Sequence, residues 1–286
     1  MVENKSQLIN ITQLLTLQEE DLVLIDARSG TDVKDKYLEQ HLKGALFVDL
    51  NEDLSDIKAD FANGGRHPLP STKQFSKLLT QLGITPQSRV VVYDDKNGAN
   101  AAARFWWMLK AIGHEQVQVL DGGLTELISE QVPMSSEIEK ARVVPPYPVT
   151  SWQLPISDID QVERISKNTD YLVIDVRTPK RYAGEIEPID LIAGHIPGAI
   201  NIPFSSNLDE EGNFLSKAEL KGKYQAIIGD RKMENVIIHC GSGVTACHSI
   251  LAIAQAELPI PKLYVGSWSE WSRNDKEMIT KSDTIS

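Results

Sequence analysis

A single cysteine stands where a predicted buried strand gives way to a glycine-containing turn. The stretch from Val236 to Ala246 reads VIIHCGSGVTA. An apolar, β-branched run leads to Cys240, and a serine with one glycine on each side follows it. The Ala-, Ile- and Leu-rich segment that follows predicts a helix from Thr245 to Glu257. Backbone N–H groups of such a turn, together with the positive end of a helix, favour an anion and therefore the thiolate form of a cysteine. Cys240 is thus the candidate nucleophile.

The simpler interpretation of Cys240 is a small apolar residue that ends a core strand. A plain strand-to-helix connection does not need glycines on both sides of Ser242, however. Those glycines make room for several N–H groups to converge on one point, which favours chemistry at the thiol. Cys247 follows about two helical turns later, and we expect its thiol to pack in the core rather than to act as a resolving cysteine.

Composition places the chain among soluble globular proteins with room for two domains, because it has 286 residues, 41% of them hydrophobic and 24% charged. A net charge of −11 argues against a nucleic-acid partner, although a local basic pocket could still bind a small anion.

The sequence has no run of about eighteen apolar residues, so it predicts no membrane helix. Residues 1–16 lack the pattern of a secretory signal, so we expect a cytoplasmic protein. Two cysteines are too few for a disulfide framework or a structural zinc site.

The chain repeats itself in four blocks that recur in the same order. The matching blocks are Leu22–Arg28 with Tyr171–Arg177, His41–Ala45 with His195–Ala199, Val90–Asp94 with Val236–Cys240, and Val119–Leu124 with Leu263–Trp268. The repeat predicts two homologous domains, at 1–136 and 151–286, which are too long to be solenoid units. Residues 137–150 carry a proline-rich stretch that resists helix and sheet, and we interpret them as the linker.

Apolar strands alternate with helix-patterned stretches within each repeat, for example at 101–112 and 217–228. This alternation predicts an α/β fold in which each domain has a parallel sheet covered by helices on both faces. Ligands collect beyond the carboxyl ends of such strands, where Asp94 and Cys240 are both expected. A carboxylate at this position cannot replace a thiol and would repel an anion. The first domain is therefore expected to be catalytically silent and the second to react.

Several motifs together resemble the two-domain rhodanese family of sulfurtransferases. They are Cys240–Thr245, Ile174–Arg177, Arg181–Gly184, Gly194–Ala199 and Gly266–Trp271. The likeness covers essentially the whole chain and implies tandem rhodanese-like domains with a silent first domain. It also implies that Cys240 takes sulfur from a small anionic donor as a persulfide and passes it to a thiol, to cyanide or to a reduced dithiol protein. The backbone of the substrate-binding loop, formed by Gly241, Ser242, Gly243, Val244 and Thr245, would stabilise the negative charge without a metal or an organic cofactor.

The resemblance also bears on the sulfur donor. Thiosulfate enzymes of the family place basic residues directly after the cysteine, whereas the sequence from Gly241 to Gly243 is similar to the loop of the 3-mercaptopyruvate enzymes. In that subfamily a serine, a histidine and an aspartate are proposed to cooperate. Ser242 and His67 match the first two, and Asn51 stands at the aspartate's position, where an amide cannot share a proton as a carboxylate does.

Arginines are the expected partners of the donor. Arg181 matches the family arginine that grips the donor, and its planar fork suits a carboxylate or a sulfonate. Ile189 stands where the 3-mercaptopyruvate enzymes have a second arginine. Arg66 and His67 lie in a glycine- and proline-containing loop without a counterpart in the second domain, which makes both candidates for substrate binding. We expect 3-mercaptopyruvate as the donor, with thiosulfate as the alternative.

Residues that recur in both domains are expected to be structural. They are the acid–base pairs Asp26/Arg28 and Asp175/Arg177 and the histidines His41 and His195. His239 alternates away from Cys240 along its strand, so we expect a core residue rather than a base. Trp106 and Trp107 are expected to pack in the core or at a domain interface. Trp268 and Trp271 are expected either to pack in the interior or to shield the persulfide from water.

Two other functions compete with sulfur transfer. Cysteine phosphatases occur on related folds, but they need an arginine six residues after the nucleophile, where this chain has Ala246. A non-enzymatic persulfide carrier or sensor would be expected to have a damaged loop. The intact loop beside an arginine favours an enzyme.

Overall fold

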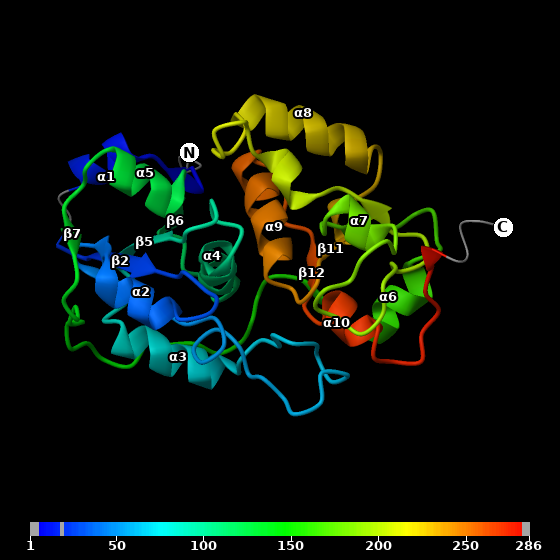
Figure 1. Cartoon of the computed structure of the whole chain (residues 1–286), viewed down its shortest axis with the longest axis horizontal. Coiled ribbons are helices and arrows are strands. Elements are labelled where there is room, and N and C mark those ends of the chain that lie inside the picture. Colours follow the sequence, from blue (N-terminus) through cyan, green and yellow to red (C-terminus); the bar gives the residue numbers. More distant parts are fainter. Residues whose placement is uncertain (1–5, 18–19, 282–286) are drawn as a thin grey trace. The chain divides into compact units, whose positions relative to one another are not determined.

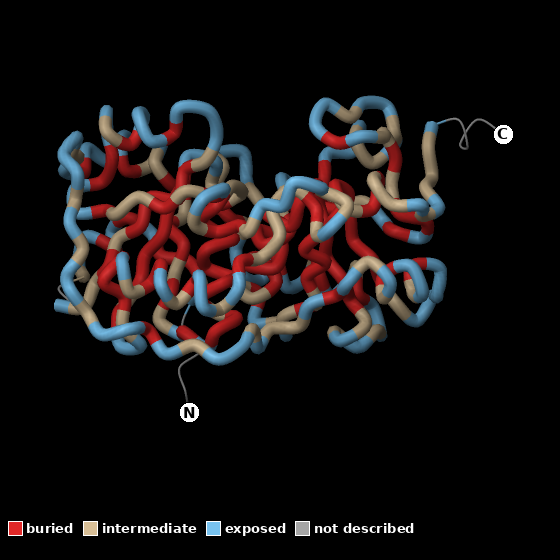
Figure 2. The backbone as a smooth tube through the Cα atoms, turned by 90° about the horizontal axis from the view of Figure 1, so that it is seen from below, coloured by how far each residue is buried: buried red, intermediate tan, exposed pale blue. Residues whose placement is uncertain are grey.

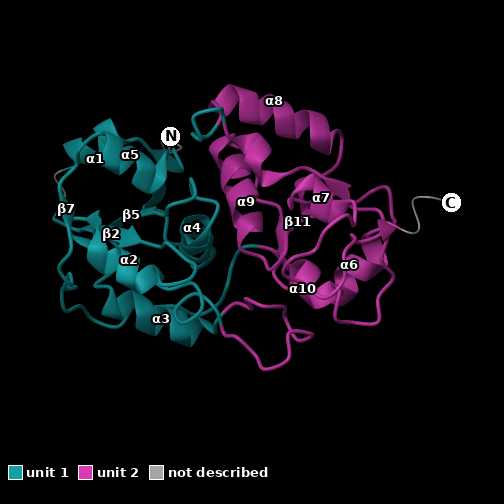
Figure 3. Ribbon diagram, viewed as in Figure 1, with its two compact units in different colours: residues 1–55, 70–154, 209–214 teal, residues 56–69, 155–208, 215–286 magenta. Residues whose placement is uncertain are grey.

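The computed structural model describes residues 6–17 and 20–281, and the chain folds into two compact units (Figure 3). Unit 1 comprises 1–55, 70–154 and 209–214, and unit 2 comprises 56–69, 155–208 and 215–286. The division differs from a simple cut at the linker, because 56–69 belongs to unit 2 and 209–214 to unit 1. As a result, Arg66 and His67 belong to the same unit as Cys240.

Unit 1 is built on a parallel sheet that carries helices (Figure 1). Its strands are β1 (Leu8–Ile9), β2 (Leu22–Asp26), β3 (His41–Leu42), β4 (Ala45–Phe47), β5 (Arg89–Tyr93), β6 (Val117–Leu120) and β7 (Met134–Ser135). Its helices are α1 (Ile11–Thr16), α2 (Val33–Glu39), α3 (Thr72–Gln81), α4 (Ala101–Ala111) and α5 (Gly123–Ser129). Within the described residues the main sheet has the order β1-β6-β5-β2-β4, and β3 pairs with β7 in a short antiparallel ladder.

The core of unit 1 lies on the faces of this sheet. Helices α1 and α5 contribute Ile11 and Leu127 to one cluster, which also contains Val91 of β5. Helices α3 and α4 pack on each other through the rings of Phe75 and Phe105, whose centroids are 6.0 Å apart. Buried backbone runs through the interior of the unit in Figure 2. The alternation of strand and helix thus produces the expected layered arrangement.

Unit 2 repeats the plan of unit 1. Its strands are β8 (Ile156–Ser157), β9 (Leu172–Asp175), β10 (Ile200–Asn201), β11 (Val236–His239) and β12 (Lys262–Tyr264). Its helices are α6 (Ile159–Ile165), α7 (Pro179–Tyr182), α8 (Lys217–Ile228), α9 (Thr245–Gln255) and α10 (Ser267–Trp271), with 3-10 turns at Phe204–Asn207 and Met233–Asn235. The described strands form a sheet of order β10-β9-β11-β12-β8 in which every pairing is parallel.

Helices cover both faces of the second sheet. Helices α6 and α10 contribute Val162, Trp268 and Trp271 to a buried cluster with Val173 and Ile237 of the strands. In Figure 1, α8 and α9 lie on the other side of β11. The predicted α/β architecture with parallel sheets is therefore confirmed.

Local sequence signals account for most element boundaries in unit 2. Strand β11 ends one residue before Cys240, and α9 begins at Thr245 as predicted, although it ends at Gln255. Ser216 caps α8, because its hydroxyl accepts the backbone N–H of Glu219 while the Glu219 carboxylate accepts the N–H of Ser216. This reciprocal capping box fixes the start of α8.

Residues 137–150 form neither helix nor strand, as their prolines predict. None of the described helices combines the length and the hydropathy that a membrane span requires. The expectation that residues 1–16 do not form a secretory signal depends in part on residues 1–5, which lie outside the described residues.

Candidate active site

Cys240 lies at the carboxyl edge of the second sheet, directly after its central strand β11. Because the neighbouring strands are parallel, β9 and β12 end at the same edge, and Ser267, which follows β12, lies within hydrogen-bond distance of the backbone of Cys240. The residue is 2% exposed. Burial and the converging strand ends place the thiol in a protected position beside the start of α9.

The backbone around Cys240 is held by α10. The N–H of Cys240 donates to Oγ of Ser267 at 3.1 Å, and its carbonyl accepts the N–H of Trp268 at 3.1 Å. The carbonyl of Gly241 accepts the N–H of Ser269 at 2.8 Å. Ser267 has φ +53°, a left-handed conformation that is uncommon for a residue with a side chain. The strained turn at Ser267 therefore fixes the backbone that carries Cys240.

The loop after Cys240 offers several backbone N–H donors. Within residues 6–17 and 20–281, the backbone N–H groups of Gly241, Ser242 and Val244 donate no hydrogen bond. Gly243 makes this course of the chain possible, since it has φ +74° and a Cβ there would lie 2.4 Å from the carbonyl oxygen of Val265. Donors of this kind at the start of the 11-residue helix α9 suit an anion.

Ser242 and His67 form a polar pair next to the cysteine. Oγ of Ser242 lies 2.8 Å from Nδ1 of His67, although the two residues are 175 positions apart in the sequence. The segment that carries His67 is docked on α10: the N–H of Gly64 donates to the Glu270 carboxylate, and the N–H of Arg66 donates to Oγ of Ser269. The structure thus brings together two predicted site residues that the sequence holds far apart.

Two predicted arginines reach the same loop. A Cβ atom at Gly241 would lie 3.1 Å from Nη2 of Arg66 and 3.4 Å from Nη1 and Nη2 of Arg181. Both guanidiniums are mostly buried, with 19% and 14% of the side chains exposed. Positive charge therefore surrounds the residue that follows Cys240. Ile189, where the resemblance to the 3-mercaptopyruvate enzymes leads one to expect a second arginine, is instead 53% exposed.

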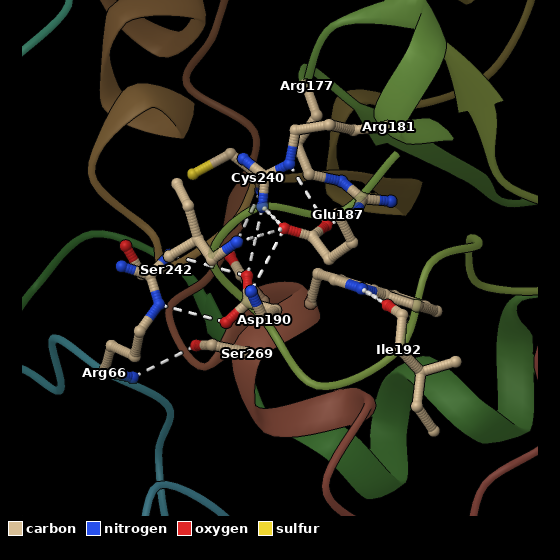
Figure 4. A network of polar contacts seen from close by, with 12 residues as sticks. Arg66, Arg177, Arg181, Glu187, Asp190, Ile192, Cys240, Ser242 and Ser269 are labelled. Atoms are coloured by element: carbon tan, nitrogen blue, oxygen red, sulfur yellow. Dashed lines mark hydrogen bonds and ion pairs between the residues drawn. The ribbon is translucent and has the colours of Figure 1, made fainter. Parts of the chain in front are cut away.

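Buried carboxylates hold these arginines in place, as Figure 4 shows. Glu187 accepts Nε and Nη2 of Arg181 at 3.1 and 2.7 Å and Nη1 of Arg177 at 3.2 Å. Burial acts to raise the pKa of Glu187, but hydrogen bonds from Arg181 and from the backbone of Asp190 outweigh it and lower the pKa below its usual value. Asp190 accepts Arg66 and Arg181 in turn.

Sequence reasoning missed Glu187, Asp190, Arg273, Ser267 and Ser269. The first two follow Arg181 by six and nine residues, and an arginine expected beside an anion needs acidic neighbours to hold it. That requirement is a usable signal. Arg273 donates to Asp190 at 3.1 Å and also stacks on the ring of Phe61. The two serines act through contacts between distant parts of the chain.

The residues that recur in both units make matching structural contacts. Arg177 donates to Asp175 through Nε and Nη2, as Arg28 does to Asp26, and each pair is buried. His195 stacks on Tyr182 at 3.9 Å, just as His41 stacks on Tyr37 at 3.8 Å. His239 is fully buried, and burial lowers its pKa, so its imidazole is neutral near pH 7.

Asp94 occupies the place in unit 1 that Cys240 has in unit 2, directly after the central strand β5. Its carboxylate accepts the backbone N–H groups of Lys96, Gly98, Asn100 and Ala102 at 2.8–3.2 Å. Burial raises the pKa of Asp94 to about 6, against these donors, which act to lower it. A built-in carboxylate thus fills the ring of N–H groups in unit 1.

No cluster of three or more His, Cys, Asp or Glu side chains suited to a metal ion is present in the described part of the chain. The chemistry that the side chains themselves can support is nucleophilic attack by a thiol. Backbone N–H groups, two guanidiniums and a serine–histidine pair lie at the loop that follows this cysteine.

Comparisons with known proteins agree with this geometry. The model of the rhodanese-like domain matches residues 10–130 and 158–274. A probable 3-mercaptopyruvate sulfurtransferase of Pseudomonas aeruginosa is 36% identical over 98% of this chain and 100% of its own length. A thiosulfate sulfurtransferase of Bos taurus is 34% identical over 84% of this chain and 80% of its own.

A solved structure shows the same fold over nearly the full length. It is SseA from Escherichia coli, described as a 3-mercaptopyruvate sulfotransferase with the rhodanese fold. The match has a TM-score of 0.74 and 29% identity and covers 93% of this chain and 100% of the other. With two matched domains and relatives above 30% identity over most of its length, the chain belongs to the rhodanese family and is a sulfurtransferase.

Proposed function

We propose that this chain transfers a sulfane sulfur from 3-mercaptopyruvate to a thiol through a persulfide on Cys240. The observation that carries the proposal is the 2.8 Å contact between Ser242 and His67 in the loop that also bears the cysteine. A hydroxyl and an imidazole in contact can handle a proton, which is what the leaving group of this donor requires.

In the first half-reaction the Cys240 thiolate attacks the sulfur of 3-mercaptopyruvate. A sulfur–sulfur bond forms, the carbon–sulfur bond breaks, and its electron pair passes to the enolate of pyruvate. The Ser242 hydroxyl, paired with His67, supplies a proton to that enolate. The persulfide that remains on Cys240 is stabilised by backbone N–H groups such as those of Ser242 and Val244.

In the second half-reaction an acceptor removes the outer sulfur. A small thiol, a reduced dithiol protein or cyanide attacks it, and Cys240 leaves as a thiolate. Because the enzyme is modified between the two half-reactions, ping-pong kinetics are expected. No metal or organic cofactor has a part in either step. We place the reaction in the cytoplasm, without nucleic-acid or membrane partners.

The arginines favour an anionic donor. Arg66 and Arg181 approach Gly241 from different segments, and we propose that both bind the donor. Thiosulfate enzymes have a basic side chain directly after the cysteine. At position 241 of this chain, such a side chain would lie close to both guanidiniums. Arg66 thus supplies the second guanidinium that Ile189 does not.

Thiosulfate is the second candidate donor, because the bovine relative is named a thiosulfate sulfurtransferase. Its reaction would release sulfite by breaking a sulfur–sulfur bond, and no carbanion would need a proton. The pairing of Ser242 with His67 would then have no role in the first half-reaction. This difference ranks thiosulfate below 3-mercaptopyruvate.

The test is a comparison of kcat/KM for the two donors, each with cyanide and with a small thiol as acceptor. We expect the value for 3-mercaptopyruvate to exceed that for thiosulfate. A higher value for thiosulfate would reverse the assignment of the donor. Inactivity with both donors would instead indicate a persulfide carrier or sensor.

Replacing Arg181 with alanine is expected to raise KM for either donor by about 10- to 100-fold, because a charge-assisted hydrogen bond is worth roughly 1.5–3 kcal/mol. We expect kcat to change less, since the arginine binds the donor before and during the reaction. The exposed Arg164 of α6 gives a matched control, because Arg164→Ala removes the same charge away from the site. An unchanged KM in Arg181→Ala would remove this arginine from donor binding.

We propose that the domain at 1–136 is catalytically silent, with 137–150 as linker and 151–286 as the reactive domain. Asp94→Ala removes the acceptor of several backbone N–H groups and is expected to lower the free energy of unfolding by about 2–4 kcal/mol. Measured above pH 7, where Asp94 is ionised, kcat/KM should stay within about threefold of wild type. A loss of several orders of magnitude in a folded variant would show that the first domain takes part in the chemistry.

A further inference from the structure

We infer that Asp190 is a positioning residue that sets the guanidiniums of Arg66 and Arg181 beside the nucleophile loop. The inference rests on the proposed role of these arginines in donor binding. Asp190 follows the segment of Arg181 and belongs to neither the cysteine loop nor the segment that carries Arg66. In Figure 4 it lies between Arg66 and Arg181.

The carboxylate of Asp190 is shared among arginines from separate segments. Its Oδ1 accepts Nε of Arg66 at 3.0 Å and Nη1 of Arg273 at 3.1 Å, and its Oδ2 accepts Nη2 of Arg181 at 3.1 Å. The side chain of Asp190 has no exposed surface. A fully buried carboxylate is stable only when cations and hydrogen bonds compensate it, so these contacts fix its place.

Arg66 depends on Asp190 more than Arg181 does. Over the residues that the structure describes, Asp190 is the acid that pairs with Arg66, whereas Arg181 is also bound by Glu187 in a bidentate contact. Arginine side chains have much conformational freedom to lose when they are ordered. Without Asp190, Arg66 would have to be ordered by the donor itself, which would weaken donor binding.

Net charge alone predicts the opposite effect. Asp190 is negative and lies close to a position that binds an anion, so its removal should strengthen the attraction for the donor. Positioning predicts weaker binding, because the guanidiniums lose the carboxylate that aims them at Gly241. The sign of the change in KM therefore separates the two views.

The experiment measures kcat and KM for 3-mercaptopyruvate and thiosulfate in Asp190→Asn. We expect KM to rise by about tenfold or more, with kcat within about threefold of wild type. Glu185→Gln is the matched control, since Glu185 is an exposed acid of the same segment, and its loss should leave KM within about twofold. Asp190→Glu keeps the charge and moves the carboxylate, so it should also raise KM and provides a second test if the asparagine variant does not fold.

Double variants identify what Asp190 acts through. If it positions Arg66, adding Asp190→Asn to Arg66→Ala should raise KM by less than Asp190→Asn does alone. A merely structural role would give the same increase in both backgrounds. A KM that is unchanged or lower in Asp190→Asn, while Arg181→Ala raises it, would overturn this inference and leave the donor site standing. An unchanged KM in Arg181→Ala would overturn the donor site itself.

Discussion

Cys240→Ser is expected to abolish sulfur transfer from both donors, with kcat/KM reduced by about 10⁴-fold or more, as is typical when the nucleophile of a covalent mechanism is removed. A serine hydroxyl is far less acidic than a thiol and cannot hold a sulfane sulfur. The substitution is close to isosteric at a position that is 2% exposed, so the fold should be kept. The release of pyruvate or sulfite measures turnover, and mass spectrometry shows whether donor treatment adds one sulfur atom to the protein.

Cys247 provides the control for this experiment. It lies in α9, fully buried, with its Sγ 3.3 Å from the carbonyl oxygen of Gly243. Cys247→Ala removes the other thiol of the chain and should leave kcat/KM within about tenfold of wild type, because the change is a small buried truncation. Substantial transfer by Cys240→Ser, or loss of the added sulfur only in Cys247→Ala, would show that Cys240 is not the nucleophile.

The elements that carry the cysteine could be predicted because their signals are local. The β-branched run before Cys240 and the Ala- and Ile-rich segment after it have different periods, and each agrees with its observed element, β11 and α9. The internal repeat added an independent check, since Asp94 follows β5 as Cys240 follows β11. Short elements escaped prediction: the two-residue strands β3 and β7 pair through a contact between residues about 90 positions apart, which no local pattern encodes.

Cys240 was predicted from its own chemistry and its place after a buried strand, whereas Ser242, His67 and Arg181 were predicted from the resemblance to the rhodanese family. The structure places all four residues in one unit. Asp190 was missed because its role depends on three-dimensional convergence. The same holds for the docking of residues 56–69 on α10, which requires Ser269 to meet the backbone of Arg66 across 203 positions.

Gly243→Ala is expected to cause the second large loss, because the loop can take its course only with glycine at this position. Gly243 has φ +74°, and the added Cβ would lie 2.4 Å from the backbone oxygen of Val265 and 3.0 Å from its Cα. The backbone of Val265 cannot rotate away as a flexible side chain could. Relief of the clash must move the loop, and with it the backbone N–H groups that follow Cys240. Displacement of catalytic groups by about 1 Å can cost roughly 100-fold in rate, and we expect a loss of that size in kcat/KM.

Stability should fall together with activity. The left-handed conformation and the clash are expected to lower the free energy of unfolding by about 2–4 kcal/mol in Gly243→Ala. Gly222→Ala is the matched control, since Gly222 lies inside α8 and a Cβ there would meet nothing within 4 Å. Because alanine favours a helix interior, that variant should gain about 0.5–1 kcal/mol with unchanged turnover. Chemical denaturation and donor kinetics on both variants separate the effect on stability from the effect on activity. Full activity in Gly243→Ala would show that the anion-binding loop does not depend on the left-handed turn.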